Sequence, residues 1–286
     1  MTRDLLFFGL AWNFCRRDCD SPMTNTLFEY YYPMEKKDFD GKYLLKIAKQ
    51  FREELEDVKR PIKDVKWYPY DTLSNFVHLN EFFDSFPLNK LIAYGSNILD
   101  IGAADGELAF MCEKLGYQPK VIDYAPTNHN NLQGIRTLSN VLNSKVEIFD
   151  FNLDSYSAID SILPNPVSLT FLLGIHYHLK NPFLILDFLS PKTEYLIFST
   201  RISRYTPKGY EMKSESISYL LSDSELNNDP TNFWVFSEKA ILRLFERTGF
   251  EVVRSKCVGD TTNSVPNDME HDERFFALLR SKNFKG

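Results

Sequence analysis

Hydrophobic and polar positions follow two periods along the chain from residue 96 onward. Short apolar runs bounded by Gly, Asp or Asn predict β-strands, and apolar positions that recur every three or four residues predict amphipathic helices. The strands predicted in this way are 97–101, 118–123, 145–150, 167–173, 194–200, 250–258 and 273–281. The helices predicted between them are 106–116, 128–141, 180–190 and 237–248. Because strands alternate with helices, we expect an α/β fold with a mainly parallel sheet and helices on both faces.

Three segments modify this simple alternation. The last two strands are joined by a polar loop without a helix, so we expect them to pair antiparallel. Residues 1–65 form an N-terminal helical extension, with a helix predicted over 41–60, before a domain that spans 66–286. A further helix is predicted over 74–86. Residues 201–236 show no clear period, and a long connection at the carboxyl end of a strand predicts a lid or wall for a substrate.

Composition and charge narrow the class of protein. Among 286 residues, 43% are hydrophobic and 25% charged, which is typical of a folded globular protein. The net charge of −6 argues against broad electrostatic binding to nucleic acid. Cys15 and Cys19 have no second Cys or His pair nearby, so we expect no metal site and reduced, cytoplasmic thiols. The apolar run 5–12 is too short to cross a bilayer, so we expect no membrane span.

The segment Asn97–Glu107, NILDIGAADGE, carries the strongest chemical signal in the sequence. A strand with an acid at Asp100 breaks into a turn between Gly102 and Gly106, and a helix follows. This arrangement presents backbone N–H groups to a nucleotide-like ligand at the carboxyl edge of a sheet. The G-x-x-x-G spacing fits neither the dinucleotide fingerprint nor the P-loop, which disfavours a nicotinamide dehydrogenase.

This segment resembles motif I of the class I S-adenosylmethionine (SAM) methyltransferases, [D/E]-x-G-x-G-x-G. Asp100, Gly102 and Gly106 match the motif, and Ala104 stands where its middle glycine is usual. The resemblance implies a Rossmann-like, seven-stranded sheet whose strand 7 is antiparallel, with SAM as the cofactor.

The resemblance also implies which residues bind SAM. Asp123 ends the second predicted strand, where an acid accepts hydrogen bonds from a ribose diol. Asp150 ends the third, where the family places an acid near the adenine, and Asp154 competes for that role. The complete set of predicted cofactor-binding residues is Asp100, Gly102, Ala103, Ala104, Gly106, Asp123, Tyr124, Asp150, Phe151 and Gly174.

The fourth predicted strand is followed by the segment GIHYHLKNP, residues 174–182. It resembles the G-[VI]-x-Y-H-L-x-[ND]-P segment of a subset of SAM enzymes, which implies that Gly174, Tyr177 and His178 lie under the sulfonium. Histidine is the natural general base near neutral pH. Tyr177, His178 and, more weakly, His176 are therefore the predicted catalytic residues.

The resemblance extends over about residues 60–281 to an uncharacterised group of bacterial methyltransferases, through Trp67–Tyr70, Asn227–Trp234 and the segment near the C-terminal strand. This group is akin to the transferases that complete the 5-oxyacetate group on wobble uridine of tRNA. The aromatic residues in the segments 67–70 and 227–234 of this chain either close over the cofactor, stack on a flat acceptor, or bury the N-terminal extension against the sheet.

The acceptor stays open between several classes. The acidic charge favours a small metabolite or glycan, and tRNA remains possible. A basic patch of Arg201, Arg204, Lys208 and Lys213 is a candidate site for an anionic acceptor group. A rival reaction is carboxymethyl transfer from carboxy-SAM, for which Arg201 or Arg274 would bind the carboxylate. A rival of another class is a non-catalytic, SAM-binding regulatory subunit.

Overall fold

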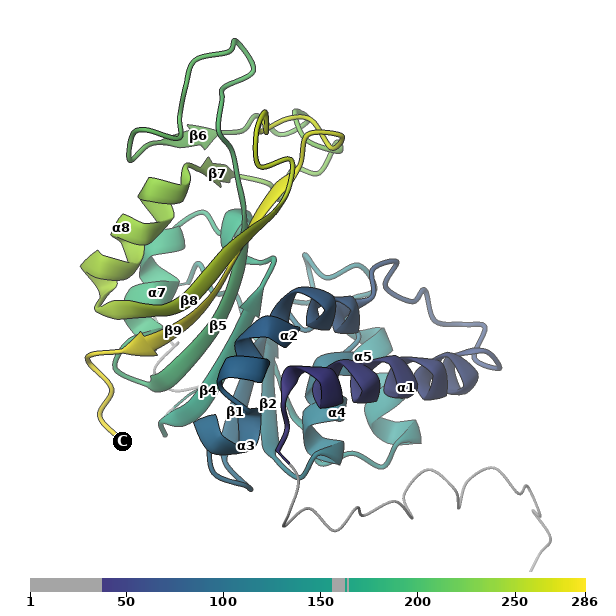
Figure 1. Ribbon diagram of the computed structural model, residues 1–286. Coiled ribbons are helices and arrows are strands. Elements are labelled where there is room, and N and C mark those ends of the chain that lie inside the picture. The colour runs from purple at the N-terminus through teal and green to yellow at the C-terminus, as the bar shows by residue number, and fades with distance from the viewer. Residues whose placement is uncertain (1–37, 156–162, 164) are drawn as a thin grey trace, which may run out of the picture. The chain divides into compact units, whose positions relative to one another are not determined.

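A computed structural model describes residues 38–155, 163 and 165–286 of the chain (Figure 1). The apolar run 5–12 and the cysteines Cys15 and Cys19 lie outside the described residues. The helices are α1 (Gly41–Lys59), η2 (Thr72–Asn75), α2 (Phe76–Ser85), α3 (Leu88–Leu91), α4 (Glu107–Lys114), α5 (Gln133–Val141), η3 (His176–His178), α7 (Pro182–Leu189) and α8 (Glu238–Thr248). The strands are β1 (Asn97–Ile101), β2 (Gln118–Asp123), β3 (Glu147–Asp150), β4 (Val167–Leu173), β5 (Thr193–Ile202), β6 (Ser218–Leu220), β7 (Trp234–Phe236), β8 (Phe250–Gly259) and β9 (Glu273–Ser281). Residues 38–286 form one compact unit.

The predicted sheet is confirmed. Strands β3, β2, β1, β4 and β5 pair in that order and all run parallel. Strand β9 inserts between β5 and β8 and pairs antiparallel with both, as expected for the last strand of this fold. The short strands β6 and β7, which the sequence pattern did not predict, lie in the 201–236 insertion and extend the sheet from the end of β5.

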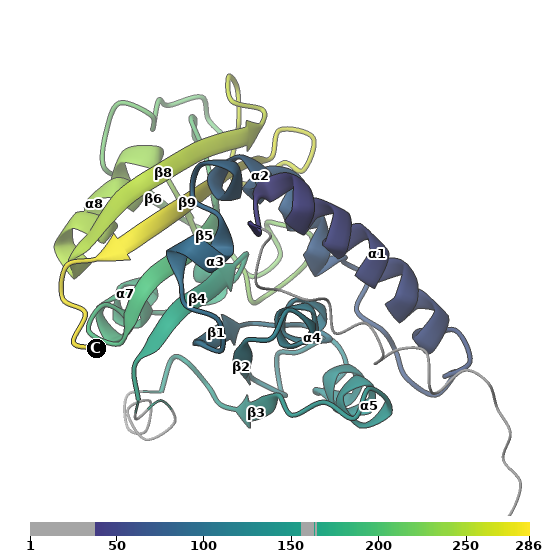
Figure 2. The ribbon, with the colours of Figure 1, turned by 60° about the horizontal axis from the view of Figure 1, so that its bottom comes forward.

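The helices cover both faces of the sheet (Figures 1 and 2). Helices α4 and α5 follow β1 and β2 on one face, which α1 and α2 also cover, and α7 and α8 lie on the other. The two faces follow from right-handed crossovers that move outward in opposite directions from the centre of the sheet. The strand order therefore reverses between β1 and β4, and the carboxyl ends of these strands border the crevice where α/β sheets bind ligands.

Burial of the sheet on both faces explains why the strand sequences are nearly continuous apolar runs. Leu99, Phe171, Leu196, Phe198 and Phe275 are fully buried on the central strands. A sheet covered on both faces has no solvated side, so alternation between apolar and polar residues is lost.

Two helix boundaries show how local chemistry sets the ends of elements. Helix α8 begins after Ser237, whose hydroxyl accepts from the Ala240 N–H, and ends at Gly249 with φ 83°. Helix α5 begins five residues later than position 128, where the sequence pattern placed it, because the Asn128 side chain accepts from the N–H groups of Asn130 and Leu132 and holds a turn. Among the described residues, no helix has the length and apolar character needed to cross a membrane.

Candidate functional site

The turn between β1 and α4 is built from residues with left-handed backbone conformation. Gly102, Ala104 and Gly106 have φ angles of 72°, 55° and 84°. A Cβ atom at Gly102 would lie 2.1 Å from the Ile175 side chain, so this turn packs directly against the segment that follows β4. The structure therefore brings the two predicted motifs, 97–107 and 174–182, into contact at the carboxyl edge of the sheet.

Asp123, at the end of β2, ties the second strand to this turn. Its Oδ2 atom accepts from the Ala104 N–H at 3.2 Å and from the Asn128 amide at 3.1 Å, and its Oδ1 atom accepts from the Tyr124 N–H at 2.7 Å. Burial raises the pKa of the carboxyl, whereas these hydrogen bonds favour its ionised form. The carboxylate is half-buried and lies beside the glycine turn.

Asp100 lies beneath the turn and is almost fully buried. Its Oδ2 atom has no hydrogen-bond partner among the described residues. Burial, and then the charges of Asp123 and Glu107, raise the pKa of Asp100 to about 8. The Asp100 carboxyl group is therefore largely protonated at neutral pH.

The two acids that competed for the adenine position have different surroundings. Asp154 accepts from the N–H groups of Lys180 and Asn181, at 3.2 Å and 3.1 Å, and so holds the segment before α7. Asp150 is exposed at the end of β3, directly opposite Asp123 in the strand register, and accepts from the Ala125 N–H. Asp150 is therefore the more exposed of the two, and Asp154 is half-buried. The Phe151 N–H donates to the Asp123 carbonyl, which continues the ladder between β2 and β3 beyond their ends.

The three residues of η3 have different surroundings. His176 is fully buried between Phe198 and Phe236, its Nε2 atom lies 3.1 Å from the Pro182 carbonyl, and burial lowers its pKa to about 4. These surroundings favour a structural role for His176, and its place among the catalytic residues stays a prediction.

His178 and Tyr177 lie against each other, with ring centroids 4.2 Å apart. The Nδ1 atom of His178 lies 2.9 Å from the Thr231 hydroxyl and 3.2 Å from the Thr231 carbonyl. Because the hydroxyl donates its proton to Asp229 and the carbonyl only accepts, Nδ1 carries the proton and Nε2 keeps its lone pair. Burial lowers the pKa of His178, which keeps the ring neutral.

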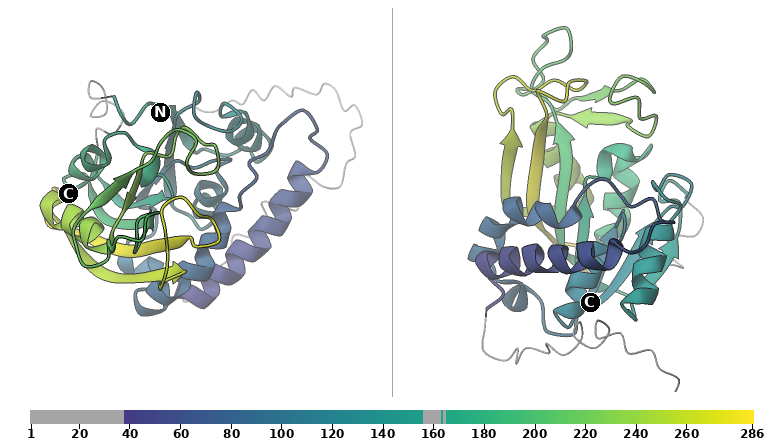
Figure 3. Two further views of the ribbon diagram at one scale, coloured as in Figure 1. Left: turned by 90° about the horizontal axis from the view of Figure 1, so that it is seen from above. Right: turned by 90° about the vertical axis from the view of Figure 1, so that its right-hand side faces the viewer.

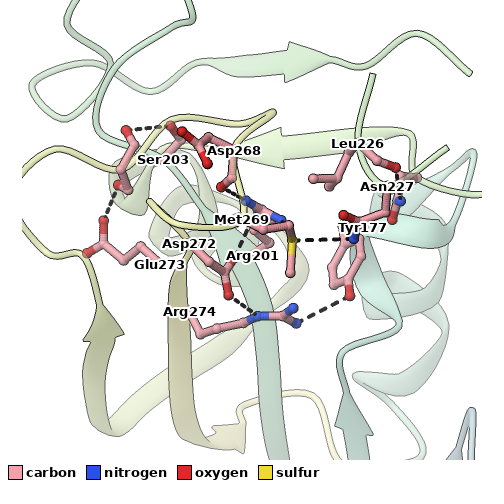
Figure 4. Close-up of polar contacts among 12 residues, drawn as sticks. Tyr177, Arg201, Ser203, Leu226, Asn227, Asp268, Met269, Asp272, Glu273 and Arg274 are labelled. Carbon is pink, nitrogen blue, oxygen red and sulfur yellow. Dashed lines mark hydrogen bonds and ion pairs between the residues drawn. The ribbon is translucent and has the colours of Figure 1, made fainter. Parts of the chain in front are cut away.

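Arg274, on β9, completes the group around Tyr177 (Figure 4). Its Nη1 atom donates to the Tyr177 hydroxyl at 3.2 Å, its Cζ atom lies 5.4 Å from the ring centroid, and its Nε atom pairs with Asp272 at 3.0 Å. Gly174 lies beside this group, because a Cβ atom built there would have, among the described residues, only the Arg274 Nη1 atom within 4 Å. A guanidinium and a phenol therefore lie close to the end of β4.

The predicted basic patch is not a free surface. Arg201 is buried and pairs with Asp272 at 3.0 Å, and its guanidinium also donates to the Asp268 carbonyl (Figure 4). Arg204 binds the fully buried Glu273 through two nitrogens. Of the four basic residues, only Lys208 and Lys213 remain exposed. The sequence pattern missed this because the acids that pair with both arginines follow some seventy positions later.

The sequence analysis also missed a buried group of charges beneath the glycine turn. Lys59 at the end of α1 contacts Glu107 and Asp105, which flank Gly106 in the motif, and the Asp105 carboxylate accepts from the Tyr68 N–H. The available signal was two acids beside a glycine at the start of an apolar helix. Among the described residues, no group of three His, Cys, Asp or Glu side chains is arranged to hold a metal ion.

Comparisons with known proteins identify the family. A family model described as "Methyltransferase domain" matches residues 78–255, which is more than half of the chain. The chain belongs to the class I SAM-dependent methyltransferases. It is a SAM-dependent enzyme by this membership. No curated protein matches the chain by sequence.

Solved structures share the fold of this methyltransferase. The N-terminal domain of EvdMO1 with S-adenosylhomocysteine (SAH) bound is 13% identical, with a TM-score of 0.51, over 81% of this chain and 97% of that chain. The same domain in the presence of SAH and D-fucose is 14% identical, with a TM-score of 0.52 and the same coverage. At this identity the similarity concerns the fold alone.

Proposed function

We propose that this methyltransferase transfers the methyl group of SAM to an oxygen or nitrogen atom of a small metabolite or glycan. The observation that carries the proposal is the contact between the glycine turn and the segment after β4, at Gly102 and Ile175. It places the proposed cofactor residues and the proposed acceptor residues side by side at one edge of the sheet.

The described residues offer groups that are chemically suited to SAM. In our proposal, Gly102, Ala103, Ala104 and Gly106 allow close approach of the backbone. The half-buried Asp123 accepts hydrogen bonds from the ribose, and the accessible Asp150 lies on the adenine side with Tyr124 and Phe151. Gly174 leaves room for the sulfonium end of the cofactor, because a side chain there would occupy the open space beside Arg274.

The bound cofactor supplies an activated methyl group, so the protein needs mainly to position an acceptor and, where required, to remove its proton. His178 suits the second task because its ring is neutral, with Nδ1 bonded to Thr231 and the Nε2 lone pair available. The Tyr177 ring packs on His178, and its hydroxyl is oriented by Arg274. We therefore propose His178 as the general base and Tyr177 as the group that orients the acceptor.

The charges at the site support a small acceptor over tRNA. Binding of a nucleic acid draws its affinity from several accessible lysines and arginines. Arg201 and Arg204, which would have led such a patch, are instead bound to Asp272 and Glu273. The exposed remainder of the patch, Lys208 and Lys213, offers too few contacts for a polyanion.

A second candidate reaction is carboxymethyl transfer from carboxy-SAM. The observation that favours it is Arg274, which is half-buried beside Tyr177 and Gly174, where the transferred group would lie. Arg201, the other candidate cation, is held by Asp272 and Asp268 and does not suit the task. Calorimetric titration with SAM and with carboxy-SAM separates the two donors. If Arg274 binds the transferred carboxylate, the protein binds carboxy-SAM more tightly than SAM.

Calorimetry with two variants tests the proposed cofactor site. Asp123→Ala removes the proposed ribose contact, and Gly102→Val places a side chain against Ile175 in the turn. We expect both to lose SAM affinity, whereas Glu147→Gln, at the exposed start of β3, leaves it unchanged. Undiminished affinity in both variants would contradict the proposal. SAM binding without methylation of any component of a metabolite extract would instead favour the non-catalytic regulatory subunit.

A further inference from the structure

Two acids of the glycine motif bind a lysine from outside the family core. The Lys59 ammonium, at the end of α1, lies 2.7 Å from a Glu107 oxygen and 3.8 Å from an Asp105 oxygen. Glu107 also accepts from the Thr72 hydroxyl at 3.0 Å. All three charged side chains are buried, with Asp105 fully so. These two acids therefore bind side chains of the segment that precedes the sheet.

The same charges fix the backbone of residues 66–68. The Asp105 Oδ2 atom accepts from the Tyr68 N–H at 2.7 Å, and its Oδ1 atom accepts from the Asn130 amide at 2.7 Å. The Asn130 amide also donates to the Lys66 carbonyl at 3.0 Å. Residues 66–68, which we call the strap, are thus tied to the glycine turn and to the segment before α5. They belong to the blue loop that joins α1 to the next helices (Figure 3).

The side chain of Tyr68 extends from the strap toward the cofactor site. Its ring packs edge-on against His129, with centroids 5.5 Å apart, and His129 follows Asn128, which binds Asp123. Burial, and then the charges of Asp123 and Tyr177, raise the pKa of the Tyr68 hydroxyl to about 12. Asp123 ends β2 and Tyr177 follows β4, and β1 lies between these strands. The Tyr68 hydroxyl is therefore close enough to the carboxyl ends of β2 and β4 to interact with charges there.

Fold stability alone does not explain a buried cluster of this kind. When apolar side chains of similar volume replace a buried ion pair, the protein is often equally stable or more stable. The reason is that the desolvation cost of the charges offsets the attraction between them. Hydrogen bonds from Asp105 to a specific backbone N–H, however, fix the position of the strap in a way that apolar contacts do not.

We propose that the strap forms a wall of the SAM site, that Tyr68 contacts the bound cofactor, and that Lys59 is a positioning residue for this wall. The inference rests on the proposed function, because it requires SAM to lie between Asp123 and Tyr177. Lys59 then influences SAM affinity through Asp105 and the strap, without touching the cofactor.

Calorimetric titration of the full chain with SAM tests the proposal in four variants. Tyr68→Ala removes the wall, Tyr68→Phe keeps its ring, and Lys59→Met removes the buried ammonium. The matched control is Lys114→Met, because Lys114 pairs with Glu54 and so also links α4 to α1, but its side chain is about one-third exposed and does not bind the strap. We expect Tyr68→Ala and Lys59→Met to weaken SAM binding at least about fivefold, with Tyr68→Phe and Lys114→Met within about twofold of the wild type.

A double-mutant cycle separates positioning from a general loss of stability. If Lys59 acts through the strap, its effect on SAM affinity largely disappears in the Tyr68→Ala background, because residues joined in one network through Asp105 are not additive. Additive effects, or unchanged affinity in Tyr68→Ala, overturn the proposal. If Lys59→Met does not fold, Lys59→Met with Glu107→Gln removes two of the three buried charges, Lys59 and its closest partner, and allows the same comparison. Wild-type protein that binds no SAM contradicts the proposed function itself, which distinguishes the two failures.

Discussion

The Asp123 carboxylate, at the end of β2, accepts a hydrogen bond from the backbone N–H of Ala104, in the turn after β1, at 3.2 Å. This contact joins the two strand ends that hold the proposed cofactor site. It also holds Ala104 in a left-handed conformation, with φ 55°, that alanine adopts at an energetic cost. The departure from the usual glycine of the motif is therefore accommodated with strain.

Replacing Ala104 with glycine should stabilise the protein. Glycine adopts positive φ angles without steric cost, so we expect Ala104→Gly to raise the free energy of unfolding by about 1 kcal/mol. Urea-induced unfolding measures the change. The matched control is Ala103→Gly, where φ is not positive and the same substitution should lower stability. A loss of stability in both variants would show that Ala104 carries no strain.

Asp100 should make stability depend on pH. Its pKa in the folded protein, about 8, lies above its value in the unfolded chain, about 3.9. The folded state thus holds the proton more tightly, and stability is lost as pH rises from about 4 through 8. Asp100→Asn does not ionise, so its melting temperature relative to the wild type should increase between pH 6 and pH 9. A difference that stays constant over this range contradicts the assignment.

The two histidines of η3 should respond differently to the same substitution. His178→Asn removes the proposed general base and should lower kcat about 100-fold, with SAM affinity within about twofold of the wild type. Because burial lowers the pKa of His178, activity of the wild type should decline only below about pH 6.5. Steady-state kinetics with the acceptor, once a metabolite comparison identifies it, measures both effects.

His176→Asn is the corresponding control. His176 packs between Phe198 and Phe236, so we expect the substitution to lower the melting temperature. Folded His176→Asn protein should keep most of its kcat. If His176→Asn lowers kcat as much as His178→Asn in folded protein, the structural role of His176 is wrong.

Arg204 should prove structural. Removal of its side chain leaves the fully buried Glu273 carboxylate without its cation, and unpaired buried charges cost about 3–5 kcal/mol. Arg204→Met should therefore unfold at a much lower urea concentration than the wild type. Lys208→Met, on the exposed part of the same insertion, should have no measurable effect. Equal stability of the two variants would contradict this structural role and support the basic surface patch that the sequence suggested.

Much of the fold could be predicted because its signals are local. The β9 range 273–281 and the α8 range were predicted to within one residue, since an apolar run or an amphipathic pattern and its caps lie within each segment. The start of α5 was misplaced because the Asn128 side chain competes for backbone N–H groups over the next four residues. The strands β6 and β7 are too short, at three residues each, to show a period.

The site was less predictable, because its contacts join distant parts of the chain. The order of the motifs indicated which residues gather at the strand ends. The pairing of Arg201 with Asp272, or of Lys59 with Glu107, depends on tertiary structure that no local pattern encodes. The burial of His176 likewise follows from Phe198 and Phe236, on other strands, and not from its own neighbours in sequence.

A crystal structure of the protein with bound SAH tests the central claim most directly. The proposed site predicts ribose hydroxyls within hydrogen-bond distance of the Asp123 carboxylate, with the sulfur atom near Gly174 and Tyr177. SAH bound away from the carboxyl ends of β1, β2 and β4, or with its ribose remote from Asp123, would contradict the account.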